Sequence, residues 1–387
     1  MREIYLDNAA TTQCDPMVLK AIAPFWSKDY GNPSSFNDSG RKAEETVGQS
    51  RRKIARILGA KDQEIVFTSS ATEANNLAIQ GIASNFRLKP KTKNPKPHII
   101  TTQIEHQSIL EPIKQLEKEG FSVTYLSVSK QGLISLEGFK KAIQPETFLI
   151  SIIYANNEIG SIQPIKKIAK IIKELENPPY FHIDAAQAAS LDLNVNNLGV
   201  DLMTLSSHKI HGPKGIAALY VRQETKIEPI ILGGGQERGL RSGTEAVPLI
   251  VGFGKALELI QKSRIKNQNY QVRLRDHFVS GLKRTIPEAE INGPKESKDR
   301  VPHIINVVFP GIENEQLLLQ LDKHSVRASA GSACASRGIE PSHVLRAVGL
   351  SKAEARSSIR FSFSKYTTKA ELDYVLKILP KVVKKIQ

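Results

Sequence analysis

The sequence of 387 residues is 40% hydrophobic and 24% charged, which is typical of a globular protein of about two domains and excludes a disordered or fibrous chain. Its two cysteines exclude a disulfide framework and indicate a reducing compartment. The formal net charge of +15 would suit nucleic acid, but the lysines are scattered without interleaved aromatic residues. We therefore interpret the charge as a solvated basic surface, with acidic proteins or tRNA as alternatives, and expect no direct binding of nucleic acid.

The chain begins with MREIYLDNAATT, in which no apolar run follows a basic start, so we expect no secretory signal. No stretch approaches the roughly 18 uncharged apolar residues that a membrane-spanning helix needs. These features predict a cytoplasmic protein without a membrane partner. Cys14 follows this segment, and we interpret it as a structural or incidental residue.

Seven short β-rich runs follow, most of them separated by helix-compatible segments. Several runs are apolar throughout instead of alternating, which is typical of strands buried on both faces. Between them, the segment 164–176 carries apolar residues at helical spacing. This alternation predicts an α/β fold with a mainly parallel seven-stranded sheet and helices on both faces. The runs are 64–69, 98–103, 122–128, 148–156, 180–184, 202–207 and 216–222.

The pattern changes after about residue 255. A long helical pattern over 254–282 leads into a mixed region with β-rich runs at 303–310 and 358–364, and the chain closes on a basic helix. We therefore expect a second, smaller α+β domain. The expected parts are an N-terminal segment 1–15 that packs with the small domain, a large cofactor-binding domain 16–255 and a small C-terminal domain 256–387.

Polar residues follow the strand ends, where ligands bind in sheets of this kind. After the first run, SATEANN opens a helix whose N–H groups and Thr hydroxyl suit a phosphate, although N-capping by Ser70 or Thr72 is the alternative. His106 follows the second run, Asp184 ends the fifth and Lys209 follows the sixth. Alone, Asp184 would most often be a helix cap and Lys209 a surface lysine.

Together these residues place a phosphate cradle, a histidine, a carboxylate and a lysine on one edge of the sheet. Pyridoxal 5'-phosphate needs a lysine for covalent attachment and an acid that keeps its pyridine nitrogen protonated, so that the ring accepts electrons. The pattern therefore predicts a pyridoxal phosphate enzyme.

Ten motifs in order resemble those of the cysteine desulfurases of the class V aminotransferase family, in the branch that supplies sulfur for iron–sulfur clusters. The resemblance runs nearly end to end and implies the fold type I of pyridoxal phosphate enzymes, L-cysteine as substrate and a homodimer. The motifs are YLDNAATT, GNPSS, ATEANN, EHQS, NNEIGSIQPI, HIDAAQ, SSHKIHGPKG, GGGQERGLRSGT, GSACAS and SSIRFS.

The resemblance also implies roles for individual residues. Lys209 would carry the cofactor, Asp184 would pair with its ring nitrogen, and His106 would stack on the ring and take part in catalysis. Gln187 and Asn157 would bond near the phenolic oxygen, and Arg360 with Asn157 would clamp the substrate carboxylate, for which a planar guanidinium is suited. The residues expected around the phosphate are Ala71, Thr72, Ser206, His208 and, from the second subunit, Thr244.

The stretch RASAGSACASRG (327–338) is Ala, Ser and Gly apart from Cys334 and its two arginines, which predicts a flexible surface loop. In the family the loop cysteine is the nucleophile that takes sulfur from cysteine as a persulfide, releases alanine and passes the sulfur to an acceptor such as an iron–sulfur scaffold protein. Thiolation of tRNA is a second destination. We expect no resident metal, with a transient iron–sulfur ligand role for Cys334 left open.

Four residues depart from the family's pattern, namely Asn37, Ser70, Tyr154 and Ala330. None removes a residue of the implied mechanism, so they leave cofactor affinity and rate open rather than the reaction type. Family members often carry a longer tail after the last helix that docks the scaffold. The sequence ends at Gln387, which leaves docking by that route an open question.

The sequence does not support a zinc site, a dinucleotide site or a P-loop. A zinc pair of His208 and His211 lacks the Glu of the metalloprotease motif. GGGQERG lacks the strand–helix unit and distal acid of a dinucleotide site, and no P-loop is present. The remaining alternatives are a related pyridoxal phosphate enzyme, such as a selenocysteine lyase, and a catalytically weak sulfur carrier or tRNA-associated adaptor.

Overall fold

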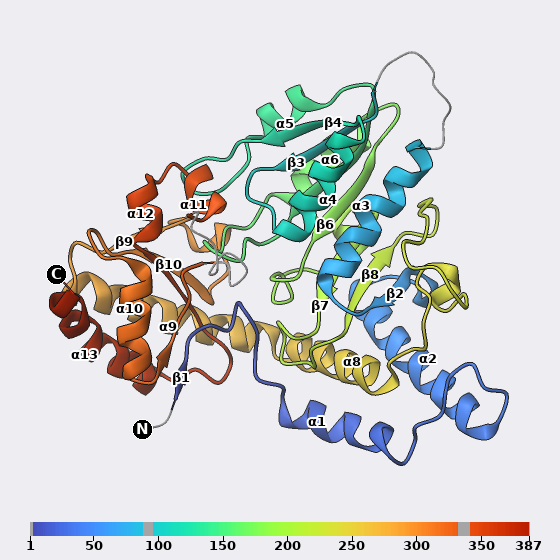
Figure 1. Cartoon of the computed structure of the whole chain (residues 1–387), viewed down its shortest axis with the longest axis horizontal. Helices are drawn as coiled ribbons and strands as arrows, with labels where there is room; N and C mark the ends of the chain where they lie inside the picture. The colour runs from blue at the N-terminus through green and yellow to red at the C-terminus, as the bar shows by residue number, and fades with distance from the viewer. Residues whose placement is uncertain (1–2, 88–95, 332–340, 387) are drawn as a thin grey trace.

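The computed structural model describes residues 3–87, 96–331 and 341–386 (Figure 1). Its largest sheet has seven strands in the order β2-β8-β7-β6-β5-β3-β4. All neighbours run parallel except β8, which is antiparallel to both β2 and β7. The prediction of a mainly parallel seven-stranded sheet is therefore confirmed. The strands are β2 (Ile65–Thr68), β3 (His98–Thr102), β4 (Ser122–Leu126), β5 (Thr147–Ile153), β6 (Tyr180–Asp184), β7 (Leu202–Ser206) and β8 (Ala217–Val221).

Helices cover both faces of this sheet, as the uniformly apolar strands require. One face packs its alternate residues against α3 (Ala71–Arg87) and α4 (Gln107–Lys118). The opposite face packs against α2 (Asp38–Leu58), α6 (Ile165–Lys173) and α8 (Val247–Lys262). Every residue of β5 is buried, because its two rows of side chains face these two separate apolar layers. Shorter helices are α1 (Pro16–Ile22), α5 (Leu136–Ala142) and α7 (Val195–Leu198).

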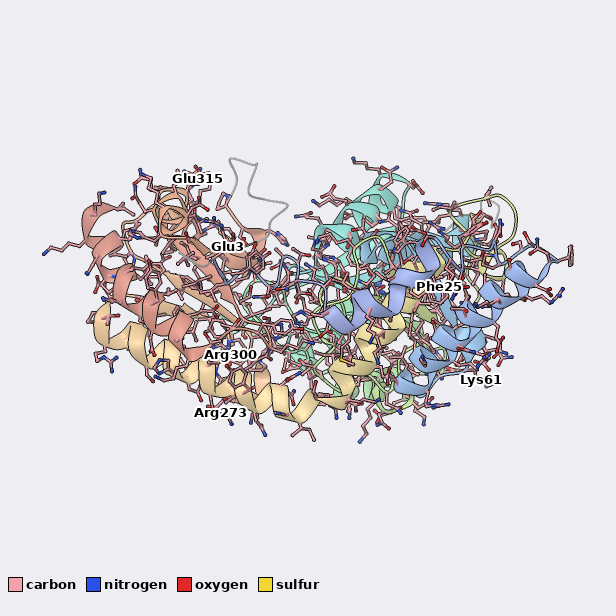
Figure 2. All side chains as sticks on the ribbon, turned by 90° about the horizontal axis from the view of Figure 1, so that it is seen from below. Glu3, Phe25, Lys61, Arg273, Arg300 and Glu315 are labelled. Atoms are coloured by element: carbon pink, nitrogen blue, oxygen red, sulfur yellow. The ribbon has the colours of Figure 1, made fainter. Side chains whose placement is uncertain are left out.

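A smaller antiparallel sheet of three strands, in the order β12-β10-β9, lies beside the large one. Its own apolar cluster joins the sheet to the helices α9, α10 and α13. Figure 2 shows α9, which carries Arg273, running beneath this part of the molecule. The elements are α9 (Arg264–Thr285), β9 (Glu290–Asn292), β10 (Ile304–Val308), α10 (Asn314–Lys323), β11 (Val326–Arg327), α11 (His343–Ala347), α12 (Lys352–Arg356), β12 (Ser358–Ser362) and α13 (Lys369–Ile386).

The helical pattern over 254–282 is not one helix. It is divided at Ser263, where α8 ends and α9 begins after a single residue. The Ser263 hydroxyl donates to the carbonyl of Leu259 at 2.9 Å, and such back-bonding by serine bends or interrupts a helix. The pattern of apolar residues could not reveal this break, because the spacing continues across it. Helix α8 also begins before residue 254 and crosses the boundary expected near residue 255.

The N-terminal segment crosses between the two sheets. β1 (Ile4–Tyr5) pairs in parallel with β11, and Asp7 bridges to Ser362 of β12. The following residues then reach the large sheet, where the N–H of Thr12 donates to the carbonyl of His208 at 2.9 Å. This path lays residues 7–12 against both parts of the molecule (Figure 1). In the described part of the chain, no helix combines the length and the apolar character that crossing a membrane requires.

Candidate active site

A cavity of about 240 Å³ opens at the carboxyl ends of the parallel strands. Side chains from the large sheet line most of it, and Arg360 enters from β12 of the small sheet. The sequence-predicted residues that the structure brings together here are Ala71, Thr72, His106, Asn157, Asp184, Gln187, Ser206, His208, Lys209 and Arg360. These ten residues come from several separate turns, strands and helices that need not meet, so their convergence is the main geometric result.

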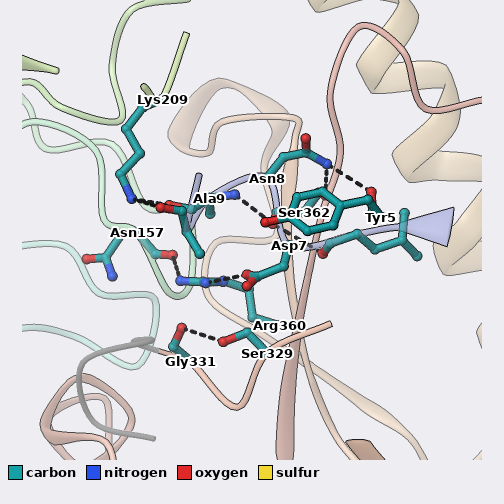
Figure 3. Close-up of polar contacts among 12 residues, drawn as sticks. Tyr5, Asp7, Asn8, Ala9, Asn157, Lys209, Ser329, Gly331, Arg360 and Ser362 are labelled. Carbon is teal, nitrogen blue, oxygen red and sulfur yellow. Dashed lines mark hydrogen bonds and ion pairs between the residues drawn. The ribbon is translucent and has the colours of Figure 1, made fainter. Parts of the chain in front are cut away.

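Lys209 lies in the turn between β7 and β8. Its Nζ donates to the carbonyls of Ala9 and Ala10 at 2.5 and 2.7 Å (Figure 3). The turn is compact, since a Cβ at Gly212 would lie 2.1 Å from the Ser207 hydroxyl, so glycine is required there. The amine is thus held at the cavity by backbone carbonyls of a segment about 200 residues earlier in the chain.

That N-terminal segment is a part of the site to which the sequence analysis gave no role. Gln187 Nε2 also donates to the carbonyl of Ala9, at 2.8 Å, and His208 Nδ1 lies 3.1 Å from the Thr11 hydroxyl. The signal was present in the motif YLDNAATT, but its residues are small or uncharged after Asp7, so no chemistry pointed to them.

Asp184 ends β6 and is buried. Its Oδ1 accepts from the N–H of Ala186 at 2.9 Å, which is the bond expected of a capping residue. Its Oδ2 accepts from the side-chain amide of Asn75 at 2.9 Å. The carboxylate therefore makes a local turn and still lines the cavity, so the capping interpretation and the functional one are compatible.

His106 is the N-cap residue of α4, with an extended backbone that turns its ring toward the cavity. The N–H of Ser108 donates to its Nδ1 at 3.1 Å, and the Ser108 hydroxyl lies 2.8 Å from the same atom. Burial lowers the pKa of His106, and Lys209 and His343 lower it further, although Asp184 opposes them. The imidazole is therefore neutral at neutral pH.

The start of α3 forms the anion-binding side of the cavity. Ala71 and Thr72 are its first residues, and the Ser70 hydroxyl caps it by accepting from the N–H of Glu73 at 3.1 Å. Opposite, the buried hydroxyl of Ser206 has no hydrogen-bond partner within the described residues. A buried polar group without a partner is rare, and here it lines the same cavity as a helix N-terminus, where anions bind. This combination fits a phosphate group.

Arg360 is 1% exposed and holds a fixed position in the site. Its Nη1 donates to the carbonyl of Asn157 at 2.8 Å, and its Nη2 donates to Asp7 Oδ1 at 2.7 Å (Figure 3). Its Nε is buried without a partner in the described chain. The guanidinium thus keeps an unused donor, which suits an anionic ligand. Asp7 is a site residue that the sequence analysis missed.

Two of the predicted residues are not part of this cavity as described. Thr244 is exposed and lines a separate cavity of about 210 Å³ with Glu237 and Arg241. Cys334 lies outside the described residues. The chain on either side is described: Gly331 has a φ of +120°, and the Ser342 hydroxyl donates to Glu158 Oε2 at 2.6 Å.

Two buried carboxyl groups beside the site also escaped the sequence analysis. Burial raises the pKa of Glu105 to about 8, although the Thr102 hydroxyl and the N–H of Ile153 donate to it at 2.7 and 2.9 Å. Burial likewise raises the pKa of Glu158. Both directly adjoin predicted site residues, His106 and Asn157, in the sequence. Burial rather than residue type distinguishes them, and burial is not readable from isolated motif residues.

The departures from the family's pattern have local structural roles. Asn37 is the N-cap of α2 and accepts from the N–H of Gly40 at 2.9 Å. Tyr154 packs in the apolar layer beneath the sheet, where burial raises its pKa to about 12. Cys14 packs at the edge of the same layer, and burial raises the pKa of its thiol. None of the three lines the cavity among the residues described.

Among the described residues, no cluster of three or more His, Cys, Asp or Glu side chains is arranged to hold a metal ion. His208 and His211 have separate partners, since His211 Nδ1 lies 2.9 Å from the carbonyl of Gln13. The chemistry of the cavity is thus that of an amine, an acid, a neutral imidazole and an anion cradle.

The model of the aminotransferase class-V family matches residues 4–375. The chain belongs to this family, and within it to the cysteine desulfurases. It is 46% identical over 387 residues to the cysteine desulfurase IscS of Dictyoglomus turgidum, covering 100% of this chain and 96% of that protein. The mitochondrial cysteine desulfurase of Candida albicans is 46% identical over 382 residues, which cover 98% of this chain and 76% of that protein.

A solved structure described as a NifS-like protein matches with a TM-score of 0.91 and 37% identity, over 99% of this chain and 100% of that chain. The family match and this structural match confirm the family and the fold type I expected from the ten motifs. Class-V enzymes of this kind depend on pyridoxal phosphate. Membership among the desulfurases favours an enzyme over the non-catalytic sulfur carrier and over the related lyases considered above.

Proposed function

We propose that the cavity binds pyridoxal 5'-phosphate and that the protein converts L-cysteine to L-alanine, leaving the sulfur as a persulfide on Cys334. The observation that supports this most strongly is the convergence of ten predicted side chains on one cavity of about 240 Å³. The names of the relatives point the same way.

The chain's own residues would hold the cofactor by five contacts. The N-terminal N–H groups of α3, with Thr72, the unpaired Ser206 hydroxyl and His208, suit its phosphate. Asp184 suits its ring nitrogen, and the Lys209 amine is the point of covalent attachment. Gln187 and Asn157 are placed for its phenolic oxygen, and His106 for stacking. When bound, the cofactor supplies an electron-accepting ring that weakens the Cβ–S bond of the substrate.

Arg360 would bind the substrate carboxylate with its unused Nε–H, beside Asn157. Its bonds to Asp7 and to the Asn157 carbonyl fix the plane of the guanidinium before the substrate arrives. A guanidinium that is already oriented loses little conformational freedom when it binds a carboxylate. Asp7 therefore acts on the substrate through Arg360.

In the sulfur-transfer step the Cys334 thiolate attacks the sulfur of L-cysteine. An S–S bond forms, the Cβ–S bond breaks, and Cβ takes up the proton that the Cys334 thiol gave up. The thiol and L-cysteine together thus become a persulfide and L-alanine, without any external oxidant. A thiol with an ordinary pKa of about 8.5 is partly ionised near neutrality and can perform this attack.

A homodimer is part of this proposal. Several large hydrophobic side chains are exposed on the segments around α1 and the 230–232 turn; four of them are the most exposed, and Phe36 alone is 98% exposed. Such side chains are typical of an interface, and the exposed Thr244 would complete the partner's phosphate site. The four are Trp26, Tyr30, Phe36 and Leu232.

We further propose the cytoplasm as the compartment, a three-part division at residues 15 and 255, and an iron–sulfur scaffold protein as the sulfur acceptor. The IscS name of the relatives supports cluster assembly. Thiolation of tRNA is a second destination for the same persulfide.

The decisive experiment is mass spectrometry after L-cysteine is added to the purified enzyme. We expect alanine in solution, a mass increase of one sulfur atom on Cys334, and cofactor attached to Lys209 after reduction with borohydride. Attachment to Lys214 instead, or alanine formation without sulfur on Cys334, would overturn the assignment. Adding a candidate scaffold protein or tRNA then shows which one removes the sulfur.

A further inference from the structure

Four side chains form an unbroken line of hydrogen bonds along the wall of the cavity. Asn75 Nδ2 lies 2.9 Å from Asp184 Oδ2 and 2.8 Å from the Ser108 hydroxyl. The same hydroxyl lies 2.8 Å from His106 Nδ1. The line joins three elements, α3, β6 and α4, and Asn75 at its centre is 0% exposed.

The direction of each proton in this line follows from the chemistry of its two ends. An ionised Asp184 can only accept, so Asn75 must turn its amide nitrogen toward it. That nitrogen then gives its second hydrogen to Ser108, whose hydroxyl is left to donate to His106. Asn75 Oδ1 is buried without a partner in the described chain. The amide therefore makes both donations from its nitrogen while its oxygen accepts no bond from these residues.

A second donor independently aims at the same imidazole atom. The backbone N–H of Ser108 points at His106 Nδ1 at 3.1 Å. A backbone N–H cannot act as an acceptor, so Nδ1 must carry a lone pair, and the hydrogen of the neutral ring lies on Nε2. Both donors would oppose a proton at Nδ1.

We propose that Asn75 and Ser108 are positioning residues that fix His106 as the neutral Nε2–H tautomer and couple that state to the carboxyl group of Asp184. The inference rests on the proposed function, because it concerns the two residues expected to contact the cofactor ring. It explains why an amide suits this position: among uncharged side chains, only an amide donates to a carboxylate and to a hydroxyl from one nitrogen.

The surroundings of His106 favour the same state. The charged and titratable groups that act on it are Asp184, Lys209 and His343. Burial, Lys209 and His343 all lower the pKa of the imidazole, and Asp184 raises it. With Nδ1 occupied, His106 presents a hydrogen-bond donor to the cavity and is not a free base in the resting site.

The test is nitrogen NMR on protein labelled with ¹⁵N-histidine, with and without cofactor, using His106→Asn to assign the signal among the nine histidines. We expect the wild-type ring to carry hydrogen on Nε2 and a lone pair on Nδ1 from pH 6 to pH 9. Asn75→Ala and Ser108→Ala weaken or remove the hydroxyl donor to Nδ1 but keep the backbone N–H of residue 108. The Nε2–H tautomer should therefore still predominate, with a detectable fraction of the Nδ1–H form and a higher pKa for His106, and kcat should fall roughly tenfold with KM nearly unchanged. Ser108→Thr keeps the hydroxyl and should restore the wild-type spectrum.

Asn85→Ala is the matched control, since Asn85 lies on the same helix and its amide donates to the exposed carbonyl of Lys226. It should leave the spectrum and the rate unchanged. A hydrogen on Nδ1 in the wild type would overturn the proposal, as would wild-type spectra for both Asn75→Ala and Ser108→Ala. If the protein makes no alanine from cysteine, the proposed function fails. The spectrum of the cofactor-free protein still tests the hydrogen-bond network in that case, so the two failures can be told apart.

Discussion

The two sides of the cavity are built in different ways. On the side of the large sheet, residues such as Asp184 and His106 are fixed by bonds to backbone N–H groups two residues away. On the side of the small sheet, Arg360 is fixed by Asp7, which is 353 residues distant, and by the carbonyl of Asn157. The backbone bonds that fix Asp184 and His106 therefore form with their own strands, although Lys209 on the same side also reaches the carbonyls of Ala9 and Ala10. The second side depends on the docking of three remote segments. Substitutions on the first side should therefore lower the reaction rate without unfolding the protein, whereas substitutions on the second side should also lower its stability.

The largest effect is expected on the sheet side, from Lys209→Ala. Removing the amine removes the point of covalent attachment, so alanine formation should fall by about 10³-fold or more. Because the change is local, the fold should persist and circular dichroism should match the wild type. The measurement is the rate of alanine production, and Lys214→Ala in the same β7–β8 turn is the control that should retain activity. A substantial rate in Lys209→Ala would remove this lysine from the mechanism.

The next effect is expected from Cys334→Ser. A serine hydroxyl is barely ionised near neutrality and is a poor nucleophile, so alanine production without added thiol should fall by about 10²-fold or more. Binding of the cofactor should be unchanged, because the residues proposed to hold it all lie elsewhere. The visible absorbance and the alanine rate measure the two properties separately. Cys14→Ser, at the other cysteine, should alter neither.

The contrast between local and remote contacts also decides what the sequence could predict. The strand-end residues were predictable, because each follows its own apolar run and the ends of parallel strands share an edge. The Asp7–Arg360 and Glu158–Ser342 contacts were not, because they span 353 and 184 residues and no local pattern encodes them. The break at Ser263 was missed because the apolar periodicity continues across it. The only local sign is the bond from the Ser263 hydroxyl to the Leu259 carbonyl, which the spacing of apolar residues does not encode.

Asp7→Ala tests the remote side directly. Arg360 is 1% exposed, and removing its partner leaves a buried cation uncompensated, which should cost about 3 kcal/mol of unfolding free energy. KM for cysteine should rise, because the guanidinium loses its fixed plane. The measurement is urea denaturation together with the KM. The exposed ion pair of Asp322 with Arg327 offers the control, since Asp322→Ala should change stability by no more than about 0.5 kcal/mol. Equal effects of the two substitutions would contradict the contrast drawn here.

Gly331→Ala probes the chain next to the segment that carries Cys334. Its φ of +120° strains any other residue, and a Cβ there would lie 2.7 Å from Glu158 Oε2, which Ser342 holds in place. We expect a loss of about 2 kcal/mol and slower transfer of sulfur to an acceptor than formation of the persulfide. Gly120→Ala is a matched control, since its φ is +100° with nothing within 4 Å of the added Cβ. It isolates the backbone strain, so an equal loss in both variants would show that the contact with Glu158 is unimportant.

The smallest effect concerns the pH dependence of the contact between the N-terminal segment and the small part of the molecule. Burial raises the pKa of the Asp15 carboxyl, but hydrogen bonds from Lys365 and Tyr366 outweigh it and lower the pKa from 3.8 to about 2. A carboxylate with a depressed pKa stabilises the fold at pH values above the unfolded-state pKa, and this contribution is lost as the pH falls through the folded-state value. Asp15→Asn should therefore cost about 1 kcal/mol at pH 7, and the difference from the wild type should shrink progressively between about pH 5 and pH 1. Urea denaturation across this range measures it, and a difference that does not shrink as the pH falls would show that Asp15 acts only as the cap of α1, where it accepts from the N–H of Met17 at 2.8 Å.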